Sequence, residues 1–309
     1  MSIKLPISKS IANRILLLQA IHGDELMPVT ADMPDDVRVL HDALQALRDY
    51  QSVQSDQSVG EQPPLPLHLK NCGTALRFLE VHLAQCYPDA PVTLTGDARL
   101  LERRGAPTTQ TTSALILHGI DVPVTPDESP YITMSRRLAS MYRPYMGDLI
   151  EACWSAAAFW YEYVAIHGGE LFLEGLTDSS LQGDRIVADI YAWHFGVTTT
   201  FTPHGAHIKH QTSNIKHNPV SLNFERTPDL YPAIALTCER LGITLHATGT
   251  ERLAYKECNR LEAVARHETR HDHRMAMALL VAGYPVDDTA CIAKSYPAFL
   301  EQWQAIAKK

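Results

Sequence analysis

At four places in this chain, a polar and mostly basic turn leads directly into an apolar helical stretch. The first turn is residues 9–14 (KSIANR), and the others begin near Asn71, Arg99 and His271. Apolar residues at helical spacing predict a helix after each turn. A strand-like run, residues 92–95, precedes the third. The recurrence favours a mixed α/β chain of related units over one doubly wound sheet, although no clean sequence period accompanies it.

The first turn places two cations and a hydroxyl at the start of a helix. Lys9, Ser10 and Arg14 can converge there with free backbone N–H groups and the positive helix end on one phosphate or carboxylate. Taken alone, the stretch fits a serine-capped amphipathic helix with solvated basic residues better. The similar turns later in the chain favour the anion site.

Charge and composition narrow the class of protein. The length of 309 residues favours two domains. The formal net charge of −8 argues against nucleic acid or an anionic membrane as partner. No apolar run reaches membrane-spanning length and no apolar segment follows a basic start, so we expect neither secretion nor membrane insertion but a cytoplasmic protein. The cysteines contain no Cys-x-x-Cys pair, so we expect reduced thiols, no disulfide and no thiolate zinc site. They are Cys72, Cys86, Cys153, Cys238, Cys258 and Cys291.

The C-terminal half carries the densest charged motifs. Asp229 follows Thr227 and Pro228 and precedes a predicted helix, so it is either an N-cap or a functional carboxylate, and both roles can hold together. Lys256 and Arg260 are four residues apart and would share a helix face beside Glu257. Such a charge run is usually a solvated face.

Two further helices are predicted from their patterns. Residues 154–166 are apolar almost all round and interrupted by Glu162, which indicates a buried helix. Thr74 is a possible cap for the helix that follows Asn71 and Gly73.

Six short runs, in order from residue 9 to residue 297, resemble the motifs of the EPSP synthase family (3-phosphoshikimate 1-carboxyvinyltransferases). Singly most of these runs are weak, but their order makes the resemblance strong. They are Lys9-Ser10-x-x-Asn13-Arg14, Asn71-x-Gly73-Thr74-Ala75-x-Arg77, Leu94-Thr95-Gly96-Asp97-x-Arg99-x-x-Glu102-Arg103, Lys256-Glu257-x-x-Arg260, Asp272-His273-Arg274-Met275-Ala276-Met277 and Ala293-Lys294-x-x-Pro297.

The resemblance implies an enolpyruvyl transfer from phosphoenolpyruvate to the 5-hydroxyl of shikimate 3-phosphate, with no metal or organic cofactor. It implies that Asp229 is the base facing the hydroxyl and that Lys256 and Glu257 transfer protons around the methylene carbon. Both substrates are small polyanions, which gives an acidic chain a reason to concentrate cations. No nucleic acid or membrane partner is implied, and we expect a monomer. The implied substrate-binding residues are Lys9, Ser10, Arg14, Asn71, Gly73, Arg103, Ser135, Arg136, Tyr145, Arg260, Arg274 and Lys294.

The family fold, again by resemblance, has two similar domains of repeated βαβαββ units with the active site in the cleft between them. On this template residues 7–150 form one domain, and residues 151–309 with residues 1–6 form the other. Some units look truncated here: the family's Ser-Ser-Gln phosphate turn is represented at best by Ser135 and Arg136, and a strand and helix are missing after Leu261.

Two alternatives remain open from the sequence. Residues 267–271 match H-E-x-x-H, which on a helix would place His267 and His271 together for zinc with Glu268 as base. The apparent deletions also fit a non-catalytic descendant that binds an anionic metabolite. The related transferase acting on UDP-N-acetylglucosamine is less similar, because its loop cysteine has no counterpart between Arg99 and Arg103.

Overall fold

A computed structural model describes residues 1–54, 63–105, 108–211 and 219–307. The chain divides into two compact units. We call Lys9–Ile150 the N-terminal unit, and Met1–Ser8 with Glu151–Lys309 the C-terminal unit. The predicted division grouped residues 1–6, rather than 1–8, with the C-terminal part. The N-terminal unit is therefore an insertion between two segments of the other unit.

The C-terminal unit begins with a four-stranded mixed sheet in the order β1-β4-β6-β5. Strand β1 (Ser2–Lys4) pairs in parallel with β4 (Glu170–Glu174), whereas β6 (Gly205–His210) is antiparallel to both β4 and β5 (Val197–Thr202). With α7 (Trp154–His167) and α8 (Val187–His194) the chain order is β1, α7, β4, α8, β5, β6. This is one complete βαβαββ unit whose first strand comes from the N-terminus.

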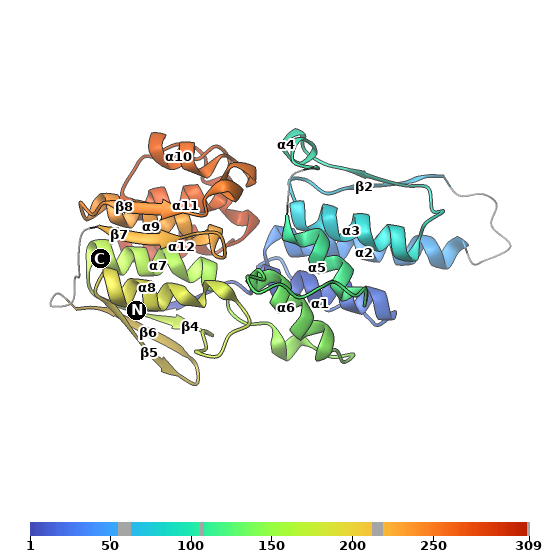
Figure 1. Cartoon of the computed structure of the whole chain (residues 1–309), viewed down its shortest axis with the longest axis horizontal. Coiled ribbons are helices and arrows are strands. Elements are labelled where there is room, and N and C mark those ends of the chain that lie inside the picture. The colour runs from blue at the N-terminus through green and yellow to red at the C-terminus, as the bar shows by residue number, and fades with distance from the viewer. Residues whose placement is uncertain (55–62, 106–107, 212–218, 308–309) are drawn as a thin grey trace. The chain divides into compact units, whose positions relative to one another are not determined.

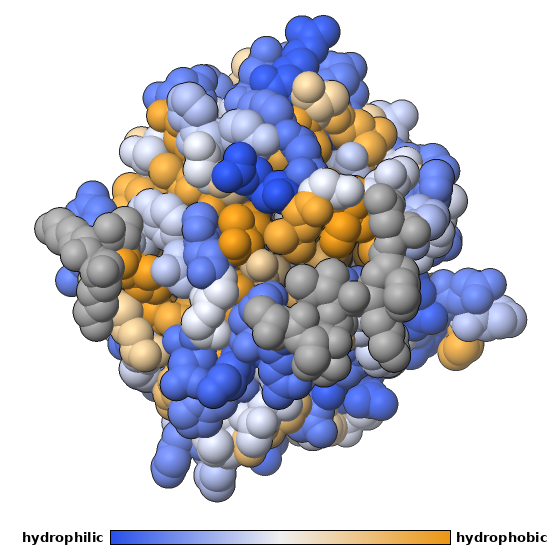
Figure 2. Space-filling view, turned by 90° about the vertical axis from the view of Figure 1, so that its left-hand side faces the viewer, coloured by the Kyte–Doolittle hydropathy of each residue, from blue (hydrophilic) through white to orange (hydrophobic). Residues whose placement is uncertain are grey.

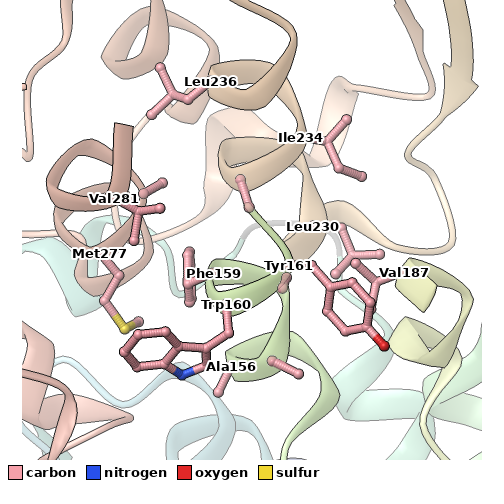
Figure 3. Close-up of a cluster of buried hydrophobic side chains, with 14 of the residues drawn as sticks. Ala156, Phe159, Trp160, Tyr161, Val187, Leu230, Ile234, Leu236, Met277 and Val281 are labelled. Atoms are coloured by element: carbon pink, nitrogen blue, oxygen red, sulfur yellow. The ribbon is translucent and has the colours of Figure 1, made fainter. Parts of the chain in front are cut away.

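Helix α7 is the central element of this unit. It packs against β4, β5 and β6 on one side and against α9 (Tyr231–Arg240) and α11 (His273–Ala282) on another, as Figure 1 shows. In the core, Trp160 lies beside Met277 and Tyr161 beside Val187 (Figure 3). An element surrounded by other elements needs apolar residues all round, which explains the sequence pattern that predicted a buried helix.

The second half of the C-terminal unit is shorter. Strands β7 (Val220–Asn223) and β8 (Leu245–Thr248) form a two-stranded parallel sheet. After α9 and β8 come α10 (Arg260–Arg266), α11 and α12 (Phe299–Ala307), and no strand follows β8 among the described residues. The predicted loss of a strand and helix after Leu261 agrees with this order.

The N-terminal unit is mainly helical. Helix α1 (Lys9–His22) packs on α2 (Asp35–Gln54), α3 (Gly73–Cys86), α5 (Thr109–Leu117) and α6 (Pro130–Ser140). In the described part of this unit, the named strands are β2 (Leu65–His68) and β3 (Val92–Thr95), which pair in parallel. The short α4 (Ala98–Glu102) follows β3. The predicted turn-to-helix recurrence thus appears at α1, α3, α5 and α11.

Among the described residues, five short 3-10 helices connect these elements. They are η1 (Gly147–Leu149), η2 (Gly183–Ile186), η4 (Pro228–Leu230), η5 (Glu251–Tyr255) and η6 (Ala290–Lys294). Three of them, η4, η5 and η6, lie next to charged residues that the sequence singled out.

Figure 2 shows one face of the molecule, on which apolar residues lie among hydrophilic ones. Among the described residues, no helix combines the length and the hydropathy needed to cross a bilayer.

Candidate active site

The main cluster of predicted catalytic side chains lies in the C-terminal unit around Asp229. Its Oδ1 atom is 2.7 Å from Arg260 Nη1 and 3.2 Å from Lys256 Nζ, and its Oδ2 atom is 3.2 Å from Arg274 Nη2. Asp229 lies inside η4 after Thr227, so it is not the helix N-cap that the sequence left open. The carboxylate is instead the common partner of three cations.

Arg260 joins this carboxylate to two more. Its guanidinium is 2.7 Å from Asp272 and 2.9 Å from Glu257, and only 1% of the side chain is exposed. The prediction that Lys256 and Arg260 share a helix face is wrong, because α10 begins at Arg260 and the backbone of Lys256 is extended. The two cations meet through Asp229 rather than through helical spacing, and the charge run is buried rather than solvated.

Glu257 and α11 complete the group. Lys294, at the end of η6, lies 3.0 Å from Glu257 Oε1. Asp272 caps α11 by accepting a hydrogen bond from the backbone N–H of Arg274, whose side chain reaches Asp229. Four cations against three carboxylates leave the group with a net positive charge. We call it the Asp229 cluster: Asp229, Lys256, Glu257, Arg260, Asp272, Arg274 and Lys294.

The electrostatic field of the cluster separates the protonation of two aspartates. Burial alone would raise the pKa of Asp229, but Arg274, Lys256 and Arg260 hold it well below its ordinary value. Burial, followed by the negative charge of Asp229, raises the pKa of Asp184 to about 6, against the hydrogen bond from Ser155. Burial also lowers the pKa of Lys256, although the charge of Asp229 opposes this. One carboxylate is therefore ionised at neutral pH while its neighbour holds a proton more readily.

Sequence reasoning missed Asp184 as a site residue. It stands in η2 within the run Gln182-Gly183-Asp184, directly before α8. An acidic residue after a glycine at a helix start was the available signal, but such residues are usually simple caps. Only the fold shows that its side chain is buried and in the field of Asp229.

A second group of predicted ligands lies in the N-terminal unit, where β3 and α4 bring Arg103 to the start of α3. Arg103 donates to the side-chain oxygen of Asn71, and Arg77 donates to the carbonyls of Gly73 and Arg103. A Cβ atom on Gly73 would lie 2.8 Å from Arg77 Nη1, so the glycine allows the guanidinium to approach. Two arginines and a helix N-terminus make this an electropositive surface.

Lys9 and Ser10 open α1 as the sequence predicted. The Lys9 ammonium is 2.7 Å from the carboxylate of Asp36, which belongs to the first turn of α2. Ser10 is partly exposed. The basic turn is therefore in place, with an acidic partner that the sequence pattern had not assigned.

A family model described as EPSP synthase (3-phosphoshikimate 1-carboxyvinyltransferase) matches residues 1–135, 110–267 and 264–303. The chain belongs to the EPSP synthase family.

Relatives and solved structures agree with this assignment. The chain is 24% identical to 3-phosphoshikimate 1-carboxyvinyltransferase of Bacteroides fragilis, over 99% of this chain and 94% of the relative. It is 25% identical to the protein of that name from Escherichia coli O127:H6, over 99% and 96%. A structure of EPSP synthase from Acinetobacter baumannii matches 99% of this chain and 95% of that chain, with a TM-score of 0.60 and 17% identity. The predicted family and α/β fold class are confirmed.

This member of the EPSP synthase family has a reduced scaffold. The alignment with the B. fragilis relative runs over 411 positions, although the chain has 309 residues, so parts of the relative have no counterpart here. The missing parts agree with the short parallel pairs β2-β3 and β7-β8. The Asp229 cluster nevertheless retains every charged member that the family resemblance led us to expect in the C-terminal unit.

The proposed shikimate-phosphate ligands are less well assembled. Arg14 is 2% exposed and donates to Ser135 Oγ at 2.7 Å, to Ser113 and to the Tyr131 carbonyl, so it links α1 to α5 and α6. Burial lowers the pKa of Arg14 to about 10. Ser135 is fully buried in the middle of α6 and not in an exposed phosphate turn. In this structure both residues have internal roles.

The other two residues predicted for this subsite do not join them. Arg136 donates to both carboxylate oxygens of Glu128, so its charge is already neutralised. Tyr145 is 76% exposed and lies against Gly147 near the end of the unit. Thr74 does not cap α3 either, because Cys72 occupies the cap and its sulfur accepts from the backbone N–H of Ala75.

The H-E-x-x-H motif does not form the helical zinc site that its spacing allows. His267 has φ 54° and ends α10, and His271 has φ 57°. These left-handed conformations break the helix that would place the two imidazoles on one face. His267 instead lies 2.9 Å from Glu239, and His271 lies 2.6 Å from Asp288.

Proposed function

We propose that this chain transfers the enolpyruvyl group of phosphoenolpyruvate to the 5-hydroxyl of shikimate 3-phosphate, giving 5-enolpyruvylshikimate 3-phosphate and phosphate. The observation that carries the proposal is the Asp229 cluster, in which an ionised carboxylate contacts three cations in a chain of the EPSP synthase family. The relatives from B. fragilis and E. coli, which are named 3-phosphoshikimate 1-carboxyvinyltransferases, support the same reaction.

The chemistry needs one base, one proton donor and neutralisation of the anionic substrate. Asp229 accepts the proton of the 5-hydroxyl of shikimate 3-phosphate while the hydroxyl oxygen forms a bond to C2 of phosphoenolpyruvate. Lys256 and Glu257 deliver a proton to C3. Loss of phosphate from C2 and of a proton from C3 then restores the double bond. A carboxylate that stays ionised at neutral pH is always ready to accept the proton, although a low pKa makes it a weak base.

The cations of the cluster supply the substrate-binding part of the proposal. Arg260, Arg274 and Lys294 bind the carboxylate and phosphate of phosphoenolpyruvate. In the structure, Asp229 and Glu257 neutralise these cations. The two carboxylates keep the cations oriented before substrate binds, and an incoming dianion competes with these carboxylates for the cations.

The proposed shikimate 3-phosphate ligands are fewer. Lys9 and Ser10 at the start of α1 are partly accessible, whereas Arg14 and Ser135 are buried. This reduced subsite supports the second candidate, a descendant that binds an anionic metabolite without turning it over.

One experiment separates the two candidates. The purified chain is given shikimate 3-phosphate and phosphoenolpyruvate in chelator-treated buffer, phosphate release is followed, and the product is identified by mass. Release coupled to the enolpyruvyl product supports the transferase. Saturable binding of phosphoenolpyruvate by calorimetry, with a cooperative melt and no release, overturns it in favour of the binding protein.

A further inference from the structure

Three metal-binding side chains meet in the N-terminal unit, outside every motif discussed above. His82 and Cys86 lie on α3, four residues apart and so on one helical face, and His118 is the C-cap residue of α5. One ligand atom from each residue lies within 4.8 Å of the other two. Cys86 is 13 residues after Gly73 on α3, which corresponds to about 20 Å at a rise of 1.5 Å per residue. The three side chains are therefore remote from the predicted ligands at the start of α3.

The distance between the two imidazoles fits a metal better than it fits a hydrogen bond. His82 Nδ1 and His118 Nε2 are 3.4 Å apart, which is longer than the usual hydrogen-bond range of about 2.7–3.2 Å. Two nitrogens on a tetrahedral zinc ion, each about 2.0–2.1 Å from the metal, are separated by about 3.3–3.4 Å. The histidine pair therefore already has the spacing of one edge of a zinc tetrahedron.

The helices that carry the two rings hold them in place. His82 is buried on α3, and His118 ends α5. Cys86 is exposed at the last turn of α3, where rotation about its side-chain bond can bring the sulfur closer.

We propose that His82 Nδ1, Cys86 Sγ and His118 Nε2 bind one Zn²⁺ ion, with water as the fourth ligand. Nitrogen and thiolate donors in a tetrahedral arrangement suit zinc among the common divalent ions. The ion ties the end of α3 to the end of α5 in a unit whose described sheet has only two strands. The expectation of no thiolate zinc site rested on the lack of a Cys-x-x-Cys pair. That criterion does not detect a His-x-x-x-Cys pair on a helix combined with a histidine that is distant in the sequence.

The first test is zinc binding by the full chain, prepared without an affinity tag and stripped with chelator. Calorimetry and elemental analysis should give one zinc per chain. Cys86→Ser and His118→Ala should each weaken binding at least about 100-fold, because even the loss of an outer-shell partner costs about 10- to 100-fold. His267→Ala is the matched control and should bind zinc as the unmodified chain does.

A second measurement does not depend on variants. Cobalt added to the stripped chain should give a thiolate-to-metal charge-transfer band in the near ultraviolet, and Cys86→Ser should lack it. Zinc should also raise the melting temperature of the full chain but not of Cys86→Ser. Absence of saturable binding, absence of the cobalt band, or loss of zinc in His267→Ala with retention in His118→Ala would each overturn the proposal.

Discussion

Arg260 has the lowest exposure among the cations of the Asp229 cluster, and its environment explains how a buried charge is tolerated. Three carboxylates, from Asp229, Glu257 and Asp272, lie within 2.9 Å of its guanidinium. Burial works against its charge, but these neighbours raise the pKa of Arg260 well above its ordinary value. A forked guanidinium can bind several carboxylates at once, which an ammonium group cannot do with the same geometry.

Replacing this side chain should destabilise the protein strongly. Arg260→Met should lower the free energy of unfolding by about 3–5 kcal/mol at pH 7, because it leaves buried carboxylates without their partner. Urea unfolding followed by circular dichroism measures the change. Arg266→Met, at the exposed end of the same helix, is the control and should change stability by less than about 0.5 kcal/mol. Equal stability of the two variants would contradict this account.

Replacing Asp229 should separate catalysis from binding. Asp229→Asn should reduce kcat about 10²- to 10⁴-fold, the range that a general base contributes. Phosphoenolpyruvate should bind at least as tightly, because the amide no longer competes for Arg260 and Arg274. Steady-state kinetics and calorimetry measure the two effects, with the exposed Asp127→Asn as control. Unaltered turnover in Asp229→Asn would rule out its role as the base.

At the scale of elements, helix starts position the functional groups and α7 holds the C-terminal unit together. Asp272 caps α11, which carries Arg274 in its first turn, while Gly73 opens α3 beside Arg77 and Arg103. Helix α7 carries one anomaly: the Glu162 carboxyl is fully buried and has no hydrogen-bond partner among the described residues. Burial raises the pKa of Glu162 well above its ordinary value, so the folded state favours the protonated form.

Glu162 should make stability fall as the pH rises. The folded protein binds the Glu162 carboxyl proton more tightly than the unfolded chain does. Glu162 therefore does not lower the free energy of unfolding below its unfolded-state pKa, but lowers it increasingly as the pH rises towards the folded-state pKa. Glu162→Gln should therefore match the unmodified chain near pH 4 and unfold at higher urea concentration at pH 8. The exposed Glu301→Gln is the control. A difference between Glu162→Gln and the unmodified chain that does not depend on pH would contradict the explanation.

At the scale of the whole molecule, the N-terminal unit is an insertion whose two ends are held together by the other unit. The Ser8 N–H donates to the Glu151 carbonyl at 2.8 Å, the Cys153 N–H donates to the Pro6 carbonyl at 2.9 Å, and Ile7 pairs with Ala152. The chain leaves and re-enters the C-terminal unit at one place. A unit with adjacent ends can be removed without stretching the remaining backbone.

The C-terminal unit should therefore fold without the insertion. A chain in which a short glycine-serine linker replaces residues 9–150 should show a cooperative melt and native-like near-ultraviolet circular dichroism. Removing residues 1–8 as well should destabilise it further by several kcal/mol, because β1 is lost and buried Ile3 and Leu5 each contribute about 1.5–3 kcal/mol. If neither chain folds, the unit is not autonomous. If both chains are equally stable, β1 does not contribute to the stability of the unit.

The sequence by itself determined the family, the α/β class, the buried helix α7 and the charged residues near helix starts. These follow from local patterns, since apolar periodicity and short motifs are written in neighbouring residues. Only the tertiary structure decided that Arg14 and Arg260 are buried, that Asp184 lies in the field of Asp229, and that the H-E-x-x-H segment is not helical. The contact between His82 and His118 was likewise decided only by the tertiary structure. Partners far apart in the chain are chosen by packing and desolvation, which no local pattern records.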